Sequence, residues 1–382
     1  MAMTWEIRRE DLLTGLQILD MVPVRLGIPS SEFFWVRGTD ERVKMSVASY
    51  IAGEIQLQGQ GKWPTDRDFY IDRRVLLPFV YAARELKNKN TFQFQVHKKQ
   101  LIIRHGIRKA EFQSQSKVTG YSDLTKVLKE KRTSFPVSDS LRELLLCGRN
   151  CATSDAVLPH LNCVYIAKGT GSVAIKAYAA SDKVFYLGTG RVDGDIKTSI
   201  PFPLFLIDLL RADGLQKISW MGKYIVLKFE HGLIWQPISM EALDKFPLKS
   251  IRSHAKKTDT KTVAFAASSR RFSTSMLRLS YYLQSVRRKD WVVKLVGTKG
   301  KDSIAVTTSI PGSQFLERLR TTEPVKKDFQ LEWPLEILEP VFAFLSKKTK
   351  KLGMVVRMDE KRHVSYIKTG HFWLAVPSKQ EE

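Results

Sequence analysis

The chain has 382 residues and carries 62 Lys and Arg against 39 Asp and Glu, which leaves a formal net charge of +23 at pH 7. This length suits two to four domains, and the absence of an apolar stretch near the roughly 20 residues that cross a bilayer, or of a leader at Met1, predicts neither a membrane protein nor an exported one. The three cysteines lack Cys-x-x-Cys spacing, which argues against a disulfide framework or a zinc site and fits a reducing cytoplasm.

A weak internal repeat of roughly 130 residues, the size of a small domain, occurs three times along the chain. Each copy is predicted to begin with a short strand and an amphipathic helix, because β-prone residues precede a run with apolar residues at helical spacing. In the second copy Ser138 or Asp139 is the predicted N-cap. The strand and helix pairs are Thr4–Arg8 with Arg9–Asp20, Ser134–Val137 with Asp139–Thr153, and Val263–Ala267 with Ser269–Lys289.

A β-rich stretch with a shared Gly-Thr turn follows in each copy, at Gly38, Gly169 and Gly297. Aromatic and β-branched residues before a glycine turn are typical of a hairpin. A second helix and a set of closing strands are predicted next, and Pro78 and Pro340 indicate that two of these helices begin late. The second helices lie within Asp72–Asn88, Pro203–Ala212 and Pro334–Lys348, and the closing strands within Thr91–Phe112, Lys217–Pro237 and Leu352–Pro377.

The stretches Ser114–Arg132 and Arg252–Lys261 between the copies are polar and basic. Because such stretches cannot bury apolar surface, we predict that they are connectors. We therefore expect an α+β protein of three similar domains, each with two helices packed on antiparallel sheets. The expected domains are residues 1–116, 133–251 and 262–382.

The positive charge of the chain predicts a polyanionic partner. A basic surface attracts nucleic acid and binds its phosphates without reading the base sequence. The alternative, a basic protein that is merely soluble, stays open on composition alone.

Short segments in the second and third copies match one family in order and separation. His160–Ile166 is similar to a family strand that contains Leu-Asn-Gly, and Ala179–Asp182 to its Ala-Thr-Asp segment. Ile200-Pro201 resembles the Val-Pro before the second helix, and Lys245–Pro247 the Arg-Phe-Pro after the last strand. Trp373–Pro377 resembles the apolar-Met-Pro ending, although acidic residues follow it here. The family is the bacterial sliding clamp, the beta subunit of DNA polymerase III.

The resemblance implies a DNA-clamp fold: a crescent-shaped protomer whose helices face a central hole, two of which close head to tail into a homodimeric ring around duplex DNA. A protein that holds DNA yet slides needs cations near the phosphates and no base readout. We therefore expect DNA-binding residues among the basic residues of the predicted helices, with an outward-facing solvated charge as the alternative for each. The candidates are Arg9, Arg73, Arg74, Arg84, Lys87, Arg142, Arg149, Arg211, Arg270, Arg271, Arg278, Arg287, Arg288, Lys347 and Lys348.

The resemblance also implies a groove between the second and third copies, where polymerases, loaders and repair proteins of the family insert a short apolar peptide. Ordinary core packing is the alternative for its lining residues. Lys183–Tyr186 replaces the family's Gly-His-Arg-Leu, which predicts a changed groove shape and peptide motif. By motif position the lining is Leu161, Ser181, Val184, Tyr186, Pro247, Leu374 and Val376.

A third implied site is the ring seam, where the edge strand of the first copy pairs with the edge and first helix of the third. The acidic residues that the family carries there are missing from Thr307–Gly312, and Arg278 stands where an apolar residue is usual. The resemblance therefore supports the fold more strongly than it supports ring closure. The expected seam residues are Arg104, Ile107, Arg108, Phe112, Phe272 and Leu277.

Catalytic readings find little support in the residues. Acidic residues mostly stand beside basic ones, and the seven histidines show no metal-ligand spacing. Gly297–Ser303 lacks the spacing of a phosphate-binding loop. We expect no catalytic residue, no metal and no cofactor.

The expected function is that of a cytoplasmic, nucleoid-associated processivity factor. Its partners would be double-stranded DNA and a DNA polymerase with a clamp loader or other replication proteins, and no membrane. The alternative is a clamp-derived basic DNA-binding accessory protein that closes no ring and serves transcription or recombination. A phage or plasmid setting is compatible with the high basic charge. A metal-dependent nuclease is the third class of function considered.

Overall fold

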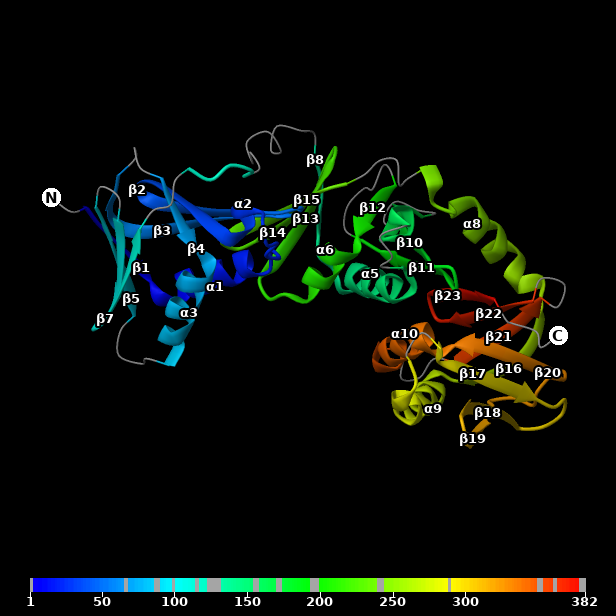
Figure 1. Ribbon diagram of the computed structural model, residues 1–382. Coiled ribbons are helices and arrows are strands. Elements are labelled where there is room, and N and C mark those ends of the chain that lie inside the picture. Colours follow the sequence, from blue (N-terminus) through cyan, green and yellow to red (C-terminus); the bar gives the residue numbers. More distant parts are fainter. Residues whose placement is uncertain are drawn as a thin grey trace. The chain divides into compact units, whose positions relative to one another are not determined.

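A computed structural model describes residues 3–64, 68–85, 90–97, 100–113, 117–121, 132–153, 158–169, 174–192, 199–238, 244–287, 290–348, 353–359 and 363–377. The chain divides into two compact units (Figure 1). The first comprises Met1–Val137 with Arg211–Ile238, and the second Ser138–Leu210 with Ser239–Glu382. Within the described residues, no helix is both long and apolar enough to cross a bilayer.

The first unit is built on one antiparallel sheet of eleven strands, in which β7-β6-β5-β1-β3-β15-β14-β13-β8 are neighbours in that order and β2 pairs with β3 and β4. Its helices are α1 (Arg9–Asp20), α2 (Pro29–Glu32) and α3 (Arg73–Tyr81), which continues as the 3-10 turn Ala82–Glu85. The strands are β1 Met3–Arg8, β2 Phe33–Ala48, β3 Ala52–Trp63, β4 Phe69–Asp72, β5 Thr91–Val96, β6 Gln100–His105, β7 Arg108–Gln113, β8 Arg132–Pro136, β13 Leu215–Met221, β14 Tyr224–Phe229 and β15 Gly232–Pro237.

Helix α1 packs closely on the sheet of the first unit. Its buried residues Leu12, Leu16 and Leu19 recur at helical spacing and form its apolar face. Gly15 permits the close approach, because a Cβ there would come within 2.9 Å of side-chain atoms of Ile55 and Leu57 on β3. The core of this unit therefore lies between α1 and the sheet.

The second unit contains an eight-stranded antiparallel sheet, β12-β9-β10-β11-β23-β22-β21-β16, and a four-stranded one, β19-β18-β17-β20. Its helices are α5 (Asp139–Cys151), α6 (Leu204–Asp208), α8 (Leu248–Lys257), α9 (Ser269–Tyr282) and α10 (Leu335–Lys348), with 3-10 turns at Pro159–Leu161, Leu209–Arg211, Thr258–Thr260 and Leu283–Ser285. The strands are β9 Cys163–Lys168, β10 Ala174–Ala180, β11 Phe185–Arg191, β12 Ile200–Pro203, β16 Thr262–Ser268, β17 Val292–Gly297, β18 Ser303–Ile310, β19 Ser313–Arg320, β20 Phe329–Pro334, β21 Gly353–Asp359, β22 Val364–Thr369 and β23 Phe372–Pro377.

Three helices of the second unit, α5, α10 and α9, lie side by side (Figure 1), with α10 packed against both others. Ser138 caps α5, since its hydroxyl accepts a hydrogen bond from the Leu141 N–H at 3.2 Å. Phe272 of α9 meets the rings of Trp333 and Phe342, so α9 and α10 share one apolar core. This helical layer is the part of the unit where the expected DNA-binding residues stand.

The order strand, helix, strands, helix, strands occurs three times, in β1–β7, β8–β15 and β16–β23. This confirms the α+β class and the threefold order expected from the sequence. The two compact units cut across the second copy, because β8 and β13–β15 join the sheet of the first unit through the pairing of β15 with β3. The boundaries at 116, 133, 251 and 262 therefore stay a prediction.

Several expected element bounds need correction. The first helix of the third copy ends at Tyr282 rather than Lys289. Pro78 and Pro340 lie inside α3 and α10, so neither helix begins late. The connector expected at Arg252–Lys261 is largely helix α8. Of the other connector, the structure describes only residues 117–121 and 132.

Candidate nucleic-acid interface and peptide site

The exposed face of α9 is the most cationic feature among the expected DNA-binding residues. Arg270 and Arg271 are exposed, and within the described part of the chain neither forms an ion pair with a carboxylate. Arg278, about two helical turns further along, pairs with Glu317 of β19 at 2.8 Å. Because α9 contains no acidic residue, its first turn keeps two uncompensated positive charges.

The arginines of α5 are already engaged with carboxylates. Arg149 makes two hydrogen bonds to Asp208 of α6, at 2.7 and 3.1 Å, and Arg142 approaches Asp139 at 4.0 Å. An exposed ion pair of this kind contributes little to stability, so its arginine can exchange the carboxylate for a phosphate. The net local charge is nevertheless smaller here than on α9.

In the first unit, two candidate arginines also have partners. Arg74 binds Asp72, the N-cap of α3, through both guanidinium and backbone contacts, and this lowers the pKa of the Asp72 carboxyl. Arg84 lies over the ring of Tyr81, 4.7 Å from its centroid. Arg9 is half-buried at the start of α1, and Arg211 is exposed at the end of a 3-10 turn. For these four arginines, contact with DNA stays a prediction.

Arg73 corrects the expectation, because it is buried and turned inward. Its guanidinium donates to the carbonyl oxygens of Ser31, Leu19 and Val22 at 2.9, 3.2 and 3.0 Å. Asp20 lies 3.6 Å away. A buried guanidinium whose hydrogen bonds go to backbone carbonyls cannot reach a phosphate, so the prediction that Arg73 binds DNA is wrong.

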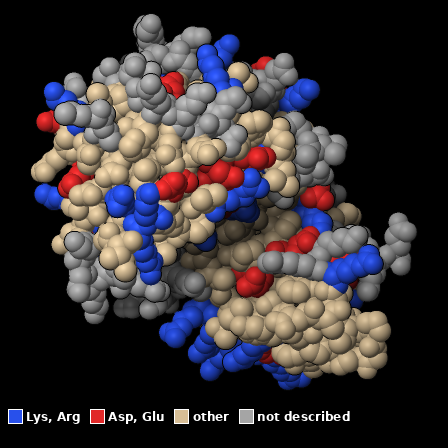
Figure 2. Space-filling model, turned by 60° about the vertical axis from the view of Figure 1, so that its left-hand side comes forward, with Lys and Arg blue, Asp and Glu red and all other residues tan. Residues whose placement is uncertain are grey.

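The remaining candidates are only partly defined. Arg287 is exposed but follows α9 instead of lying on it. Lys87 and Arg288 lie outside the described residues. Lys347 and Lys348 lie at the end of α10, where the structure describes the backbone alone. Figure 2 shows Lys and Arg side chains gathered at several places on the visible face, with Asp and Glu side chains among them.

The residues expected to line a peptide groove divide between the two faces of the eight-stranded sheet. Tyr186 donates its hydroxyl hydrogen bond to the carbonyl oxygen of Leu144 on α5 at 3.0 Å, so its side chain points toward α5. Leu374 and Val376 are buried on the same face, because Trp373 and Ala375 between them belong to the cluster on the opposite face. These three residues are core, and the prediction that they line a groove is wrong.

Ser181 and Val184 do meet at a hollow. They line a pocket of about 80 Å³ together with Phe185, His254 and Ala375. The Ser181 hydroxyl accepts hydrogen bonds from the backbone N–H groups of Lys183 and Val184, which shapes the turn into β11. Leu161 is buried on the face that carries α8, and Pro247 immediately precedes α8. We refer to this hollow as the Ser181 pocket.

Helix α8 covers the face of the sheet opposite α5, and the sequence reading missed it. Ile251 is fully buried there among Tyr165, Tyr178 and Trp373, with Leu248 and Ala255 packed beside it. The indole N–H of Trp373 donates to Thr258 at 2.7 Å, and His254 and the Tyr366 hydroxyl share a hydrogen bond at 2.8 Å. The apolar spacing 248, 251 and 255 was the one signal in the sequence that could have revealed the helix.

The expected seam residues lie in both units, and not all of them at a sheet edge. In the first unit, Arg104, Ile107 and Arg108 are exposed at and beside edge strand β7, while Phe112 is buried against Phe79. In the second unit, β19 is an edge strand, and Leu277 of α9 is exposed.

Phe272 is fully buried in the core between α9 and α10, so its assignment to the seam is wrong.

The described residues contain no group of three or more His, Cys, Asp and Glu side chains that could hold a metal ion.

Comparison with known proteins gives one consistent result. No protein-family model matches the sequence, and no curated protein matches it. Among solved structures, a DNA polymerase sliding clamp from Bacillus subtilis is similar at TM-score 0.80 and 13% identity, over 100% of both chains. The C. crescentus beta sliding clamp is similar at TM-score 0.79 and 15% identity, also over 100% of both chains.

The DNA polymerase III subunit beta from Pseudomonas aeruginosa has a TM-score of 0.79 and 13% identity, over 99% of this chain and 100% of its own. Identities this low carry the likeness of the fold alone. The chain therefore has the sliding-clamp fold of the DNA polymerase III beta subunits.

Proposed function

We propose that this chain is a sliding-clamp-like processivity factor for a DNA polymerase. It would be a non-catalytic, nucleoid-associated protein that encircles or cradles duplex DNA without sequence preference and tethers replication proteins. The observation that carries the proposal is the pair of uncompensated arginines, Arg270 and Arg271, in the helical layer of a full-length clamp fold.

The proposed mode of binding follows from the chemistry of these helices. Arginine contacts to phosphates fix a protein on the duplex but carry no base information, and their affinity comes from release of counterions. Cations on α5 and α9, the two helices that pack against α10, would meet the phosphates of one duplex while leaving the base edges unread. Such contacts re-form at each step along the backbone, which is what sliding requires.

The Ser181 pocket supports the tethering part of the proposal. It is small and lined by both apolar and polar side chains, as expected for a pocket that receives the anchor residue of a short peptide. The peptide would come from a polymerase, a clamp loader or another replication protein. Because Tyr186, Leu374 and Val376 are core residues here, the peptide motif is expected to differ from that of the family.

Ring closure is proposed through the two sheet edges, β7 of one protomer and β19 of another, with the three copies of the repeat acting as three domains on each side. Unpaired strand edges are natural templates for pairing with a second chain. A head-to-tail arrangement of two protomers would satisfy both edges.

Two measurements test the proposal together. A ring of two protomers should have about twice the protomer mass of 43.7 kDa in light-scattering measurements. The protein should also stay on nicked circular duplex DNA in high salt and leave the same DNA once it is linearised. Equal loss from circular and linear DNA would refute sliding around the duplex.

The second candidate is a DNA-binding accessory protein that closes no ring. Both proposed seam edges carry surplus positive charge, with Arg108 and Lys109 on β7 and Arg318 and Arg320 on β19. Like charges brought together oppose association. A monomeric mass with sequence-independent DNA binding would favour this candidate.

A further inference from the structure

Helix α8 presents a strongly basic surface to solvent. Its ten residues include four Lys and Arg and no Asp or Glu. All four are exposed, and three of them stand at positions i, i+3 and i+7, which places them along one side of the helix. We refer to these side chains as the α8 basic face, which consists of Lys249, Arg252, Lys256 and Lys257.

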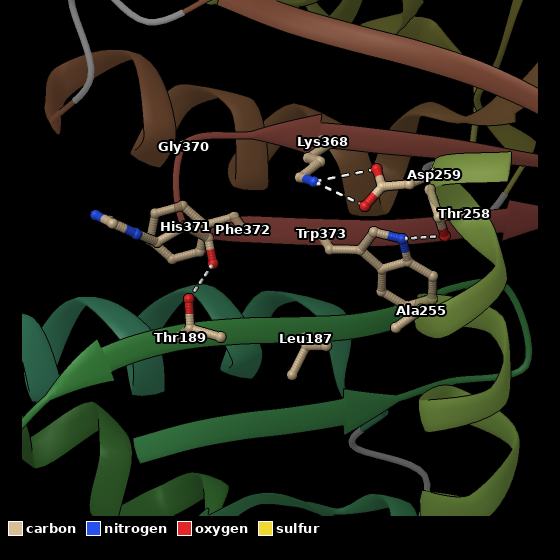
Figure 3. Close-up of a pocket in the computed structure, with 10 residues that line it drawn as sticks. All are labelled: Leu187, Thr189, Ala255, Thr258, Asp259, Lys368, Gly370, His371, Phe372 and Trp373. Carbon is tan, nitrogen blue, oxygen red and sulfur yellow. Dashed lines mark hydrogen bonds and ion pairs between the residues drawn. The ribbon is translucent and has the colours of Figure 1, made fainter. Parts of the chain in front are cut away.

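The charge of the α8 basic face has no counter-charge on the protein. In the described part of the chain, no carboxylate lies within ion-pairing distance of its three lysines. Asp259, just beyond the helix, is paired with Lys368 at 3.1 Å (Figure 3). Arg252 donates a hydrogen bond to the neutral hydroxyl of Tyr178 at 3.3 Å and keeps its charge. The helix therefore offers positive charge that a polyanion can neutralise.

Helix α8 is fixed to the sheet, so its basic face is held in one place. Ile251 is fully buried against the sheet. At the end of the helix, the indole N–H of Trp373 donates to the Thr258 hydroxyl at 2.7 Å (Figure 3). Thr258 in turn donates to the carbonyl oxygen of His254 at 2.9 Å. A partner would bind a helix that is already ordered, which lowers the entropic cost of binding.

The α8 basic face and the arginines of α5 lie on opposite faces of the eight-stranded sheet. Tyr186 of β11 bonds Leu144 of α5, whereas Tyr178 of β10 packs in one cluster with Ile251 of α8. A straight duplex bound at α5 therefore cannot touch α8, because the sheet lies between them. The α8 basic face requires a partner segment of its own.

The exposed residues of α8 favour a duplex over a membrane or a single strand. They are all polar, and none is aromatic: Lys249, Ser250, Arg252, Ser253, Lys256 and Lys257. A helix that lies in a membrane surface inserts exposed apolar side chains, and single strands gain affinity from aromatic rings that stack on their bases. Contacts to the phosphates of a duplex need only positive charge and hydrogen-bond donors.

The spacing of the lysines matches the backbone of B-form DNA. Lys249 and Lys256 are seven residues apart, about 10.5 Å along the helix axis. The major groove is about 12 Å wide, so two ammonium groups on flexible stems can reach phosphates on both of its sides. Ser253 between them adds a hydroxyl donor for a phosphate oxygen. An acidic peptide has no such fixed spacing of charges, so the duplex is the better match.

We propose that the α8 basic face binds the phosphate backbone of a duplex DNA segment on the side of the sheet opposite α5. This goes beyond the proposed function, which needs only the cations of α5 and α9. The protein would then hold two duplex segments at once, without reading the base sequence of either.

The test measures the salt dependence of binding in the Arg270→Ala with Arg271→Ala background, because the tighter of two sites otherwise dominates a titration. Lys249→Ala with Lys256→Ala, the α8 pair, is added to this background. Ala is the best helix former, so the helix should be kept, and far-UV circular dichroism verifies it. In fluorescence anisotropy with a labelled duplex, the α8 pair should flatten the slope of log K against log salt by about 1.8.

Lys299→Ala with Lys301→Ala is the matched control in the same background and the same unit. Both lysines are exposed in the turn between β17 and β18. Asp302 follows them, and Asp328 accepts a hydrogen bond from the Lys299 backbone N–H at 2.8 Å, so this turn carries carboxylates of its own. The control removes the same charge as the α8 pair and should leave the slope unchanged.

A bridging assay measures the second duplex directly, with α9 intact. Protein bound to an immobilised duplex should retain a second, labelled duplex, and the α8 pair should lower the retained label to background. Vesicles of phosphatidylglycerol are the probe for a lipid partner, and the protein should not bind them through α8.

The proposal would be overturned by a slope that the α8 pair leaves unchanged, by an equal change in the control, or by equal retention of the second duplex. Vesicle binding that the α8 pair abolishes while duplex binding is kept would overturn it as well. Retention on circular DNA is measured in parallel and should be the same in the α8 pair and the wild type. A flattened slope in a protein that circular DNA does not retain would refute the proposed function and leave the α8 surface standing.

Discussion

The guanidinium of Arg73 donates a hydrogen bond to the carbonyl oxygen of Val22 at 3.0 Å, and so ties the start of α3 to the segment that follows α1. Two further carbonyls, of Leu19 and Ser31, take the other hydrogen bonds of the same side chain. Carbonyl groups at the end of a helix have no partner within the helix, and buried ones must be satisfied by other groups. Arg73 meets that need with one side chain.

Replacing Arg73 with Met should lower the free energy of unfolding by about 3 kcal/mol or more, because the buried carbonyl groups of Val22 and Ser31 each lose a donor while the apolar volume is kept. Urea denaturation followed by circular dichroism measures the change. Arg74→Ala is the control next to it, since Arg74 is exposed and a solvent-exposed ion pair such as the one it makes with Asp72 contributes little to stability. Equal effects of the two substitutions would contradict the structural role of Arg73.

Replacing Arg270, Arg271 and Arg278 with Ala should weaken duplex DNA binding for every sequence. Arg270 and Arg271 have no carboxylate partner among the described residues, so removal of these two alone should flatten the slope of log K against log salt by about 1.8. Arg278 should add less, because Glu317 already balances its charge. Fluorescence anisotropy over a range of salt concentrations gives the slopes.

Lys217→Ala with Lys228→Ala is the matched control for charge. These exposed lysines face each other on β13 and β14 and lie on no helix, so the double substitution removes two positive charges elsewhere. Its salt slope should stay that of the wild type. A slope change as large as that of the α9 pair would show that net charge, and not the helix surface, governs binding.

Leu374→Asp with Val376→Asp should unfold the second unit instead of merely releasing a peptide. Both side chains are buried on the α5 face, and an unpaired buried carboxylate destabilises a fold by about 3 kcal/mol or more. Leu316→Asp is the control, because Leu316 is 60% exposed on β19 and its replacement should change stability by only about 0.5 kcal/mol. A double variant with wild-type stability would restore these residues as candidates for a groove.

The three cysteines should be inert in the folded protein. Burial raises the pKa of Cys163 to about 12 and raises the pKa of Cys147 and Cys151 as well, so at pH 8 none is the reactive thiolate. Ellman's reagent should label no cysteine in the native protein and all three after denaturation. Rapid labelling of any one in the native state would contradict this.

The same pKa shifts make stability depend on pH in one direction. Unfolded thiols release their protons near pH 8.5, whereas the folded thiols hold theirs to a higher pH. The stabilisation is therefore complete below about pH 8 and is lost as the pH rises from about 9 toward 12. Urea denaturation at stepped pH, compared between the wild type and Cys163→Ala, should show a smaller alkaline loss in the variant.

Local patterns were enough to predict most helices and strands and the threefold order. The leucines of α5 recur at helical spacing behind Ser138, and this information lies within about a dozen neighbouring residues. Helix α8 was missed because its apolar residues are few and its segment is rich in Lys. Such a helix is stabilised mainly by the apolar sheet face beneath it, whose strands come from distant parts of the chain.

Sequence by itself determined the element order, the α+β class and the cationic character of α9, since periodicity, turn residues and charge are properties of short segments. Only the tertiary structure decided that Arg73 points inward and that Tyr186, Leu374 and Val376 face α5. In a strand, a shift of one residue moves every side chain to the other face, and the pairing of β11 with β23 joins segments about 190 residues apart. Which face is covered, and by what, depends on contacts that no local pattern contains.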